Sequence, residues 1–173
     1  MQQRFRPAAV GLAFALLAGA AQAQAPAPAQ PQAPAASAAP APAAPAPEVF
    51  LAANAKEPGV QTLPSGLQYK VVKAGDPNGP SPKPGDVIKV HYEGKLVTGE
   101  VFDSTFERGH PTLMQLYGLV PAWMEALPRM RVGDEWTIWA PPSLGYGDRP
   151  AGPIPPNSVL VFRLQLLGML SAD

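Results

Sequence analysis

The chain has 173 residues, with 24 prolines, 16 glycines, no cysteine and equal numbers of acidic and basic residues. This length suits one domain with an accessory segment better than a two-domain enzyme. The absence of cysteine excludes disulfides, thiol nucleophiles, redox pairs and zinc ribbons. The balanced charge argues against nucleic-acid binding, which needs a basic face. The two histidines, His91 and His110, share no metal-ligand spacing, so we expect no metal and no cofactor.

The N-terminus has the features of an export signal. Arg4 and Arg6 precede an uncharged, largely apolar run over 7–21, and Ala21 and Ala23 flank Gln22. A positive head, a short apolar core and a small-x-small site are typical of signal peptides, and the core is short for a membrane span. We predict a signal peptide at 1–23 with cleavage after Ala23, after which the chain has no stable membrane insertion. A retained membrane anchor is the alternative.

Residues 24–47 contain only alanine, proline, glutamine and one serine. Frequent proline removes hydrogen-bond donors and blocks helix propagation, and no bulky apolar group is present to be buried. We therefore predict a disordered, extended Ala/Pro-rich linker at 24–47. The alternative is a Pro-x-x-Pro ligand for another domain, although the flanking cations of such ligands are absent. A short N-terminal helix or lead-in is expected at 48–58, before one folded domain at 59–170.

Alternating apolar residues dominate this domain and predict strands. The alternation is carried by four groups of residues: Leu67, Tyr69 and Val71; Ile88, Val90 and Tyr92; Trp136, Ile138 and Ala140; and Leu160, Phe162, Leu164 and Leu166. Glycine- and proline-rich turn clusters separate them.

One internal stretch reads as a helix. Pro121 suits a first helical turn, Trp123 to Leu127 follow without β-branching, and Pro128 disfavours further helix. The expected fold class is α+β, in which a twisted antiparallel sheet, a half-barrel, wraps around one short helix.

Six motifs in register carry a resemblance to a known family. They are Val90-His91-Tyr92-Glu93-Gly94, Val101-Phe102-Asp103-Ser104, Val120-Pro121-Ala122-Trp123, Gly145-Tyr146-Gly147, Ile154-Pro155-Pro156-Asn157 and Leu160-Val161-Phe162. In order and spacing they resemble FKBP-type peptidyl-prolyl cis-trans isomerases. Upstream, Phe50-Leu51 and 63–69 resemble the macrophage-infectivity-potentiator branch of Gram-negative bacteria. The resemblance covers about 59–170.

The resemblance implies an FKBP-like fold and an enzyme, a rotamase that accelerates X-Pro isomerisation in folding, exported proteins. A prolyl bond populates both isomers and exchanges slowly unaided. Desolvation in an aromatic pocket favours the twisted amide over its dipolar planar form. This reaction needs no nucleophile, metal or proton transfer. The resemblance also implies a periplasmic location, with secretion as an alternative, and a pocket that accepts macrolides such as rapamycin.

Site residues follow from the same resemblance. The catalytic set would be Tyr92, Asp103 and Tyr146, and the substrate-binding set would be Phe102, Arg108, Met114, Leu119, Val120, Trp123, Ile154 and Phe162. Trp123 would form the pocket floor and Asp103 would be steadied by Tyr92 and Arg108. The Tyr146 hydroxyl and the Ile154 backbone N–H would donate to substrate carbonyls.

From the residues alone, each of these positions has a plainer interpretation. The alternating apolar side chains could be ordinary core. Asp103 could be a turn former, Arg108 a surface cation, and Tyr146 a loop residue packed on its own sheet. His91 alternates away from Tyr92 along the strand, so we interpret it as structural rather than as a general base.

The chain also departs from the family pattern. Ala122 and Ala126 replace glycines that usually flank the helix motif, and Met114 replaces a rim aromatic. Relatives in the potentiator branch carry a long helical dimerisation region, and the absence of heptads here predicts a monomer. The expected partners are proline-containing polypeptides. The alternative function is a proline-segment-binding chaperone or interaction module with weak catalysis.

Overall fold

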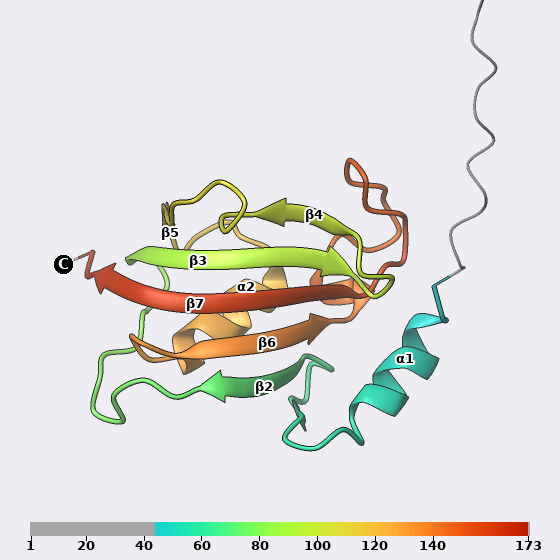
Figure 1. The fold of residues 1–173 in the computed structure, drawn as a ribbon, viewed down its shortest axis with the longest axis horizontal. Helices are drawn as coiled ribbons and strands as arrows, with labels where there is room; N and C mark the ends of the chain where they lie inside the picture. Colours follow the sequence, from blue (N-terminus) through green and yellow to red (C-terminus); the bar gives the residue numbers. More distant parts are fainter. Residues whose placement is uncertain (1–43, 173) are drawn as a thin grey trace, which may run out of the picture. The chain divides into compact units, whose positions relative to one another are not determined.

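The structure, a computed structural model, describes residues 44–172, so the predicted signal peptide and nearly all of the predicted linker lie outside the described residues. The described residues form one antiparallel sheet (Figure 1) with strands β1 (Gln61–Thr62), β2 (Gln68–Lys73), β3 (Val87–Leu96), β4 (Val101–Ser104), β5 (Thr112–Gln115), β6 (Glu135–Ala140) and β7 (Leu160–Leu170). The strand order is β1-β2-β6-β7-β3-β4, and β5 pairs with β3. The predicted α+β class is confirmed.

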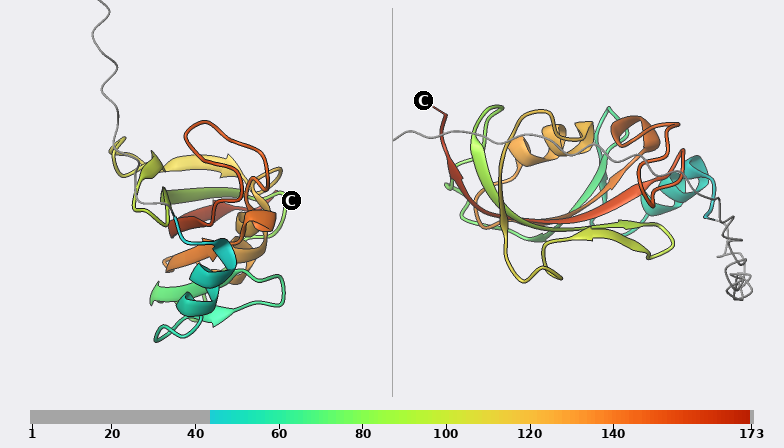
Figure 2. Two further views of the ribbon diagram at one scale, coloured as in Figure 1. Left: turned by 90° about the vertical axis from the view of Figure 1, so that its right-hand side faces the viewer. Right: turned by 90° about the horizontal axis from the view of Figure 1, so that it is seen from above.

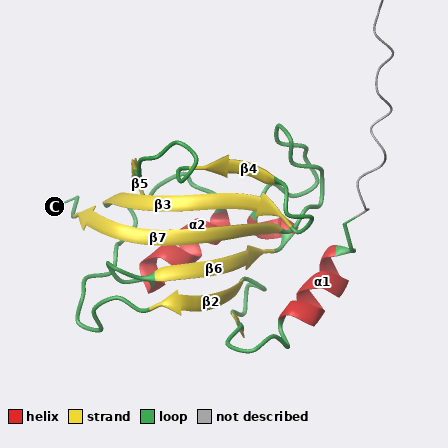
Figure 3. Cartoon of the chain, viewed as in Figure 1, coloured by secondary structure: helices red, strands yellow, loops and turns green. Residues whose placement is uncertain are grey.

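Two α-helices flank this sheet, as the cartoon in Figure 3 shows. They are α1 (Pro47–Asn54) and α2 (Pro121–Ala126), and the short 3-10 turns η1 (Leu127–Arg129) and η2 (Pro142–Leu144) complete the regular structure. The sheet curves around α2, which lies on its concave side (Figure 2). Pro121 occupies the first turn of α2, as predicted, and Pro128 falls in the 3-10 turn that ends it.

The core lies between the concave face and α2. Along β7, Leu160, Phe162, Leu164 and Leu166 are buried, while Arg163 on the other face is exposed. Ile88 and Val90 of β3 and Ile138 of β6 complete this layer. The predicted alternation is therefore correct for β3, β6 and β7. In β2 it is only partly correct, because Val71 is exposed and Gln68 is buried instead.

Helix α1 docks on the sheet through the buried Gln68. The Gln68 Nε2 group donates to the carbonyl of Leu51 at 2.8 Å, and Asn54 Nδ2 donates to Gln68 Oε1 at 2.7 Å. A buried amide needs such partners, and here both of its ends are satisfied by one helix. The predicted short helix therefore exists, although it begins at Pro47, within the predicted linker range.

Two strands have no alternating signal in the sequence. Strand β1 contains two residues, and β5 is a four-residue strand that pairs with the first half of β3. The pairing of Met114 with Ile88 brings the Met114 side chain to the concave side, where the candidate site lies. Within residues 44–172, no helix combines the length and apolarity that a membrane span requires.

Candidate functional site

A cavity of about 320 Å³ opens on the concave side of the sheet. Strands β3, β4, β5 and β7, helix α2 and two loops contribute its walls. Nine of the eleven predicted site residues line it, together with Gly118: Tyr92, Phe102, Asp103, Met114, Leu119, Val120, Trp123, Tyr146 and Phe162. Arg108 and Ile154 are the two that do not. Residues from positions 92 to 162 are thus brought together by the sheet topology.

Four aromatic rings form the inner part of this cavity. Trp123 of α2 packs edge-to-face against Tyr92, with ring centroids 4.9 Å apart, and against Phe162 at 5.5 Å. Phe162 in turn packs edge-to-face against Phe102 at 5.8 Å. This arrangement is favourable for aromatic quadrupoles and fixes the orientation of each ring. The floor of the cavity is therefore built from packed rings, and the buried indole N–H of Trp123 has no hydrogen-bond partner within the described residues.

Gly94 of β3 makes this arrangement of rings possible. A Cβ atom at position 94 would lie 2.5 Å from Cε2 of Phe102 and 3.0 Å from Cε1 of Phe162. Real side-chain atoms do not approach so closely. The pairing of β3 with β4 also shifts register directly after Gly94. The absence of a side chain at this position therefore lets two rings converge over the strand.

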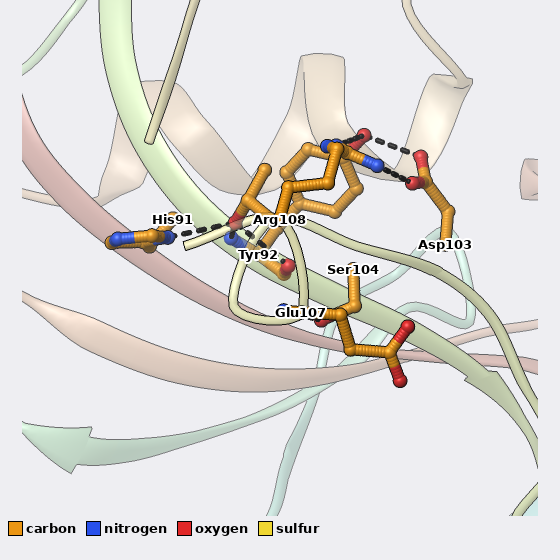
Figure 4. A network of polar contacts seen from close by, with 7 residues as sticks. His91, Tyr92, Asp103, Ser104, Glu107 and Arg108 are labelled. Carbon is orange, nitrogen blue, oxygen red and sulfur yellow. Dashed lines mark hydrogen bonds and ion pairs between the residues drawn. The ribbon is translucent and has the colours of Figure 1, made fainter. Parts of the chain in front are cut away.

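A polar cluster of Tyr92, Asp103 and Arg108 borders the aromatic rings. The Tyr92 hydroxyl donates to Oδ2 of Asp103, and the Arg108 guanidinium donates to Oδ1. Arg108 also donates to the Tyr92 hydroxyl at 3.2 Å, and its guanidinium lies 5.7 Å from the Tyr92 ring centroid. Figure 4 shows Arg108 lying near the Tyr92 ring with its guanidinium directed toward Asp103. Arg108 thus contributes to the site through Asp103 rather than by lining the cavity.

The charge state of this polar cluster follows from its contacts. Burial of the phenol raises the pKa of Tyr92, and the hydrogen bond to Asp103 raises it further. Partial burial alone would raise the pKa of Asp103, but the hydrogen bonds from Tyr92 and Arg108 outweigh that effect and hold it below its ordinary value. At neutral pH the carboxylate is ionised and both of its oxygens have donors. It is therefore arranged as a fixed charge and not as a general base.

Tyr146 reaches the cavity from a loop that several hydrogen bonds fix. The Gly147 N–H donates to the carbonyl of Pro142 at 2.9 Å, and the Asn157 N–H donates to the carbonyl of Gly147 at 2.7 Å. Gly147 has φ +65°, a conformation that favours glycine. Tyr146 lines the cavity and is 43 % exposed, so it stands at the cavity mouth instead of packing back on the sheet.

Ile154 is placed differently from the expectation. Its side chain is buried and is not among the cavity-lining residues. Its N–H donates to the carbonyl of Ala151 at 3.0 Å, because residues 151–154 form a tight turn that closes through a reciprocal bond. In the described structure this N–H is therefore not free to bind a substrate carbonyl, and the expectation is not supported.

Gly94 and Gly118 are part of this site but were not predicted from the sequence. Glycine inside a strand signals a close approach of other groups, so Gly94 could have been found from its position in β3. Gly118 has φ +68° in a loop, and no sequence signal distinguishes it from other turn glycines. The structure places His91 outside this site, stacked on Phe106 with ring centroids 4.6 Å apart.

Comparison with known families matches this chain twice. The model of the FKBP-type peptidyl-prolyl cis-trans isomerase matches residues 79–167, which contain every predicted site residue. The model of a domain amino terminal to FKBP-type peptidyl-prolyl isomerase matches residues 15–71. Within the described residues, this second match covers α1, β1 and part of β2.

Curated relatives are similar over the folded part. The peptidyl-prolyl cis-trans isomerase Mip of Coxiella burnetii is 47% identical over 121 residues, 69% of this chain and 52% of the relative. The FKBP-type 22 kDa peptidyl-prolyl cis-trans isomerase of Escherichia coli is 46% identical over 122 residues, 70% of this chain and 58% of the relative. The chain therefore spans about half the length of these relatives.

Solved structures agree with the fold. The crystal structure of FkpA from Escherichia coli has a TM-score of 0.69 at 39% identity, covering 73% of this chain and 59% of that one. A peptidyl-prolyl cis-trans isomerase from Pseudomonas syringae has a TM-score of 0.67 at 30% identity, covering 73% of this chain and 92% of that one.

Proposed function

The chain belongs to the FKBP-type peptidyl-prolyl cis-trans isomerase family, and from this premise we propose that it accelerates X-Pro isomerisation in folding polypeptides. The observation that carries the proposal is the aromatic cavity bordered by an ionised, doubly hydrogen-bonded Asp103. Such a cavity suits a small apolar ring attached to a polar amide. The proposed catalytic residues are Tyr92, Asp103 and Tyr146.

The aromatic floor would bind the prolyl ring. Trp123 and Phe162 are 5% and 4% exposed, and they present ring edges and faces to the cavity rather than polar atoms. Burial of each methylene contributes about 0.8 kcal/mol, so a prolyl ring gains only a few kcal/mol. This modest gain favours rapid release, which an isomerase of many different polypeptides requires.

Catalysis would come from favouring the twisted amide over the planar one. The barrier of about 18–20 kcal/mol reflects lost resonance, and water stabilises the dipolar planar form. A cavity that excludes water removes part of this stabilisation. Asp103 is held by Tyr92 and Arg108 before substrate arrives, so its charge needs no reorganisation as the bond rotates.

Two donors would orient the substrate carbonyl groups. The Tyr146 hydroxyl stands at the cavity mouth. The second donor would be the N–H of Val120 in place of that of Ile154. Val120 lines the cavity, and its N–H makes no backbone hydrogen bond within residues 44–172. It precedes the first turn of α2, where N–H groups lack helical acceptors.

A protease-coupled assay tests this proposal. The pure protein should accelerate cleavage of a short X-Pro peptide that the protease accepts only in the trans form. Trp123→Leu should reduce kcat/KM by about tenfold or more, because it removes the floor while leaving an apolar residue in the core. No acceleration by the folded protein would refute the proposal.

A second candidate function is a binding module that grips proline-containing segments with little catalysis. An exposed aromatic side chain next to the cavity-lining residues favours it, since Tyr117 directly precedes the lining residue Gly118 and is 76% exposed. Suppression of aggregation of an unfolded protein by Asp103→Ala, in a protein without measurable turnover, would support this candidate.

We further propose a periplasmic location, monomeric assembly and macrolide binding. The predicted signal peptide supports export, and one relative is described as an outer membrane protein, from Legionella longbeachae. The aromatic cavity supports macrolide binding. Fractionation of cells, light scattering of the exported protein and inhibition by rapamycin test these three statements separately.

A further inference from the structure

Thr105 bonds Tyr92 and lies between Asp103 and Arg108 in the chain, and we propose that it is a positioning residue for these three members of the polar cluster. It directly follows β4, two residues after Asp103 and three before Arg108. Its side chain is fully buried and is not among the residues that line the cavity. Any influence of Thr105 on the cavity must therefore pass through the residues that it holds.

The Thr105 side chain bonds both backbone groups of Tyr92. Its Oγ1 accepts the Tyr92 N–H at 2.7 Å and donates to the Tyr92 carbonyl at 3.0 Å. The Thr105 N–H donates to the same carbonyl at 2.9 Å. The last β3–β4 pair in the ladder is Glu93 with Ser104. The hydroxyl thus takes the place of the main-chain carbonyl that would accept the Tyr92 N–H if the strand continued.

His91 also contacts the Thr105 hydroxyl. Its Nδ1 lies 2.8 Å from Thr105 Oγ1. The His91 tautomer sets the direction of this bond: a protonated Nδ1 donates to the hydroxyl oxygen, and an unprotonated Nδ1 accepts the hydroxyl proton. The His91 ring stacks on Phe106 with an interplanar angle of 12°. Figure 4 shows His91 and Asp103 on opposite sides of Tyr92. The partners of this buried oxygen thus all come from β3, through His91 and Tyr92.

The turn that starts at Thr105 returns Arg108 to Asp103. The Glu107 N–H donates to Oγ of Ser104 at 3.3 Å, and the Gly109 N–H donates to the Phe106 carbonyl at 3.1 Å. These bonds shape the turn itself, while the Thr105 hydrogen bonds and the stacking of Phe106 on His91 tie its start to β3. The direction of the chain at Thr105 consequently determines whether the Arg108 guanidinium reaches both Asp103 and the Tyr92 hydroxyl.

Replacing Thr105 by valine tests the hydroxyl at constant shape, and Thr105→Ser is the matched control that keeps it. We expect Thr105→Val to raise the Asp103 pKa toward the ordinary aspartate value, and Thr105→Ser to leave the pKa near that of the parent. The pKa is measured by ¹³C NMR of the Asp103 carboxyl carbon. The kcat/KM for an X-Pro peptide should fall by about tenfold in Thr105→Val and by less than about twofold in Thr105→Ser. An unchanged Asp103 pKa in folded Thr105→Val overturns the proposal.

The activity measurement rests on the function proposed above, whereas the pKa measurement does not. A parent protein without isomerase activity would refute the function and leave the Asp103 measurement valid. If Thr105→Val does not fold, amide hydrogen exchange of the parent still tests the proposal. The Tyr92 amide should exchange as slowly as amides in the β3–β7 ladder, and rapid exchange would overturn the proposed hydrogen bond.

Discussion

Gly94→Ala is the substitution that most sharply tests the geometry of the aromatic cavity. The new methyl group would lie 2.5 Å and 2.6 Å from two ring carbons of Phe102, whereas ordinary contacts begin near 3.4 Å. The Phe102 ring must therefore retreat by about 1 Å, which disturbs its edge-to-face contact with Phe162. Overpacking of this kind costs about 1–3 kcal/mol of stability.

We expect Gly94→Ala to fold with a lowered Tm and to lose about tenfold to a hundredfold in kcat/KM for an X-Pro peptide. Gly168→Ala is the matched control, because Gly168 also lies in a strand and its added methyl would have no neighbour closer than 4.0 Å. Thermal unfolding and the protease-coupled assay measure both variants. Parent-like activity of Gly94→Ala would show that the positions of Phe102 and Phe162 do not determine catalysis.

Three further predictions address separate contacts. Tyr146→Phe should keep the Tm and lower kcat/KM by about twofold to tenfold, because one hydrogen bond to a bound carbonyl is worth about 0.5–1.5 kcal/mol. The pKa of Asp103 is lowered in the folded protein. Its ionised form therefore stabilises the fold at any pH above the ordinary aspartate pKa of about 3.9. This stabilisation is lost as the pH falls through the lower pKa of the folded protein. Asp103→Asn should therefore make Tm less dependent on pH below about pH 5. Gln68→Ala should lower stability by about 1–3 kcal/mol without changing kcat/KM, because it removes the buried amide that docks α1 far from the cavity.

Each of these predictions has a result that would contradict it. A loss of Tm in Tyr146→Phe would mean that the hydroxyl supports the loop rather than a ligand. Glu135 also has a lowered pKa, caused first by its hydrogen bond from Arg163. The Tm of Asp103→Asn should therefore still fall somewhat at acidic pH. A fall in Tm identical to that of the parent would contradict the proposed charge state of Asp103. A fall in kcat/KM with Gln68→Ala would link α1 to the site.

The sequence predicted the parts of the fold that have long, regular patterns. Strand β7 has buried apolar residues at every second position from Leu160 to Leu166, and Pro121 and Pro128 delimit the internal helix, so both could be placed. Strand β5 could not, because four residues carry no reliable period and their pairing with β3 is a long-range contact.

The candidate site could be predicted where side chains form the cavity wall. It could be predicted less well where a contribution depends on the hydrogen bonds of the backbone. Trp123 and Phe162, which the family motifs single out, both line the cavity. The Ile154 N–H could not be predicted in this way, since its availability depends on the hydrogen bonds of the turn over 151–154. The role of Thr105 could not be predicted, because a threonine that is buried and bonds β3 cannot be distinguished in the sequence from an ordinary turn residue.

Exchange NMR of an X-Pro peptide, with the protein present in small amounts, measures the proposed reaction most directly. We expect cross-peaks between the cis and trans forms with the parent, and only partly weakened cross-peaks with His91→Ala, whose ring lies outside the cavity and contacts the polar cluster only through Thr105. Phe162→Ala, which removes a wall of the cavity, should lose these cross-peaks while remaining folded at low temperature. Absence of cross-peaks with the folded parent, or equal losses in the two variants, would contradict an isomerase that works through this aromatic cavity.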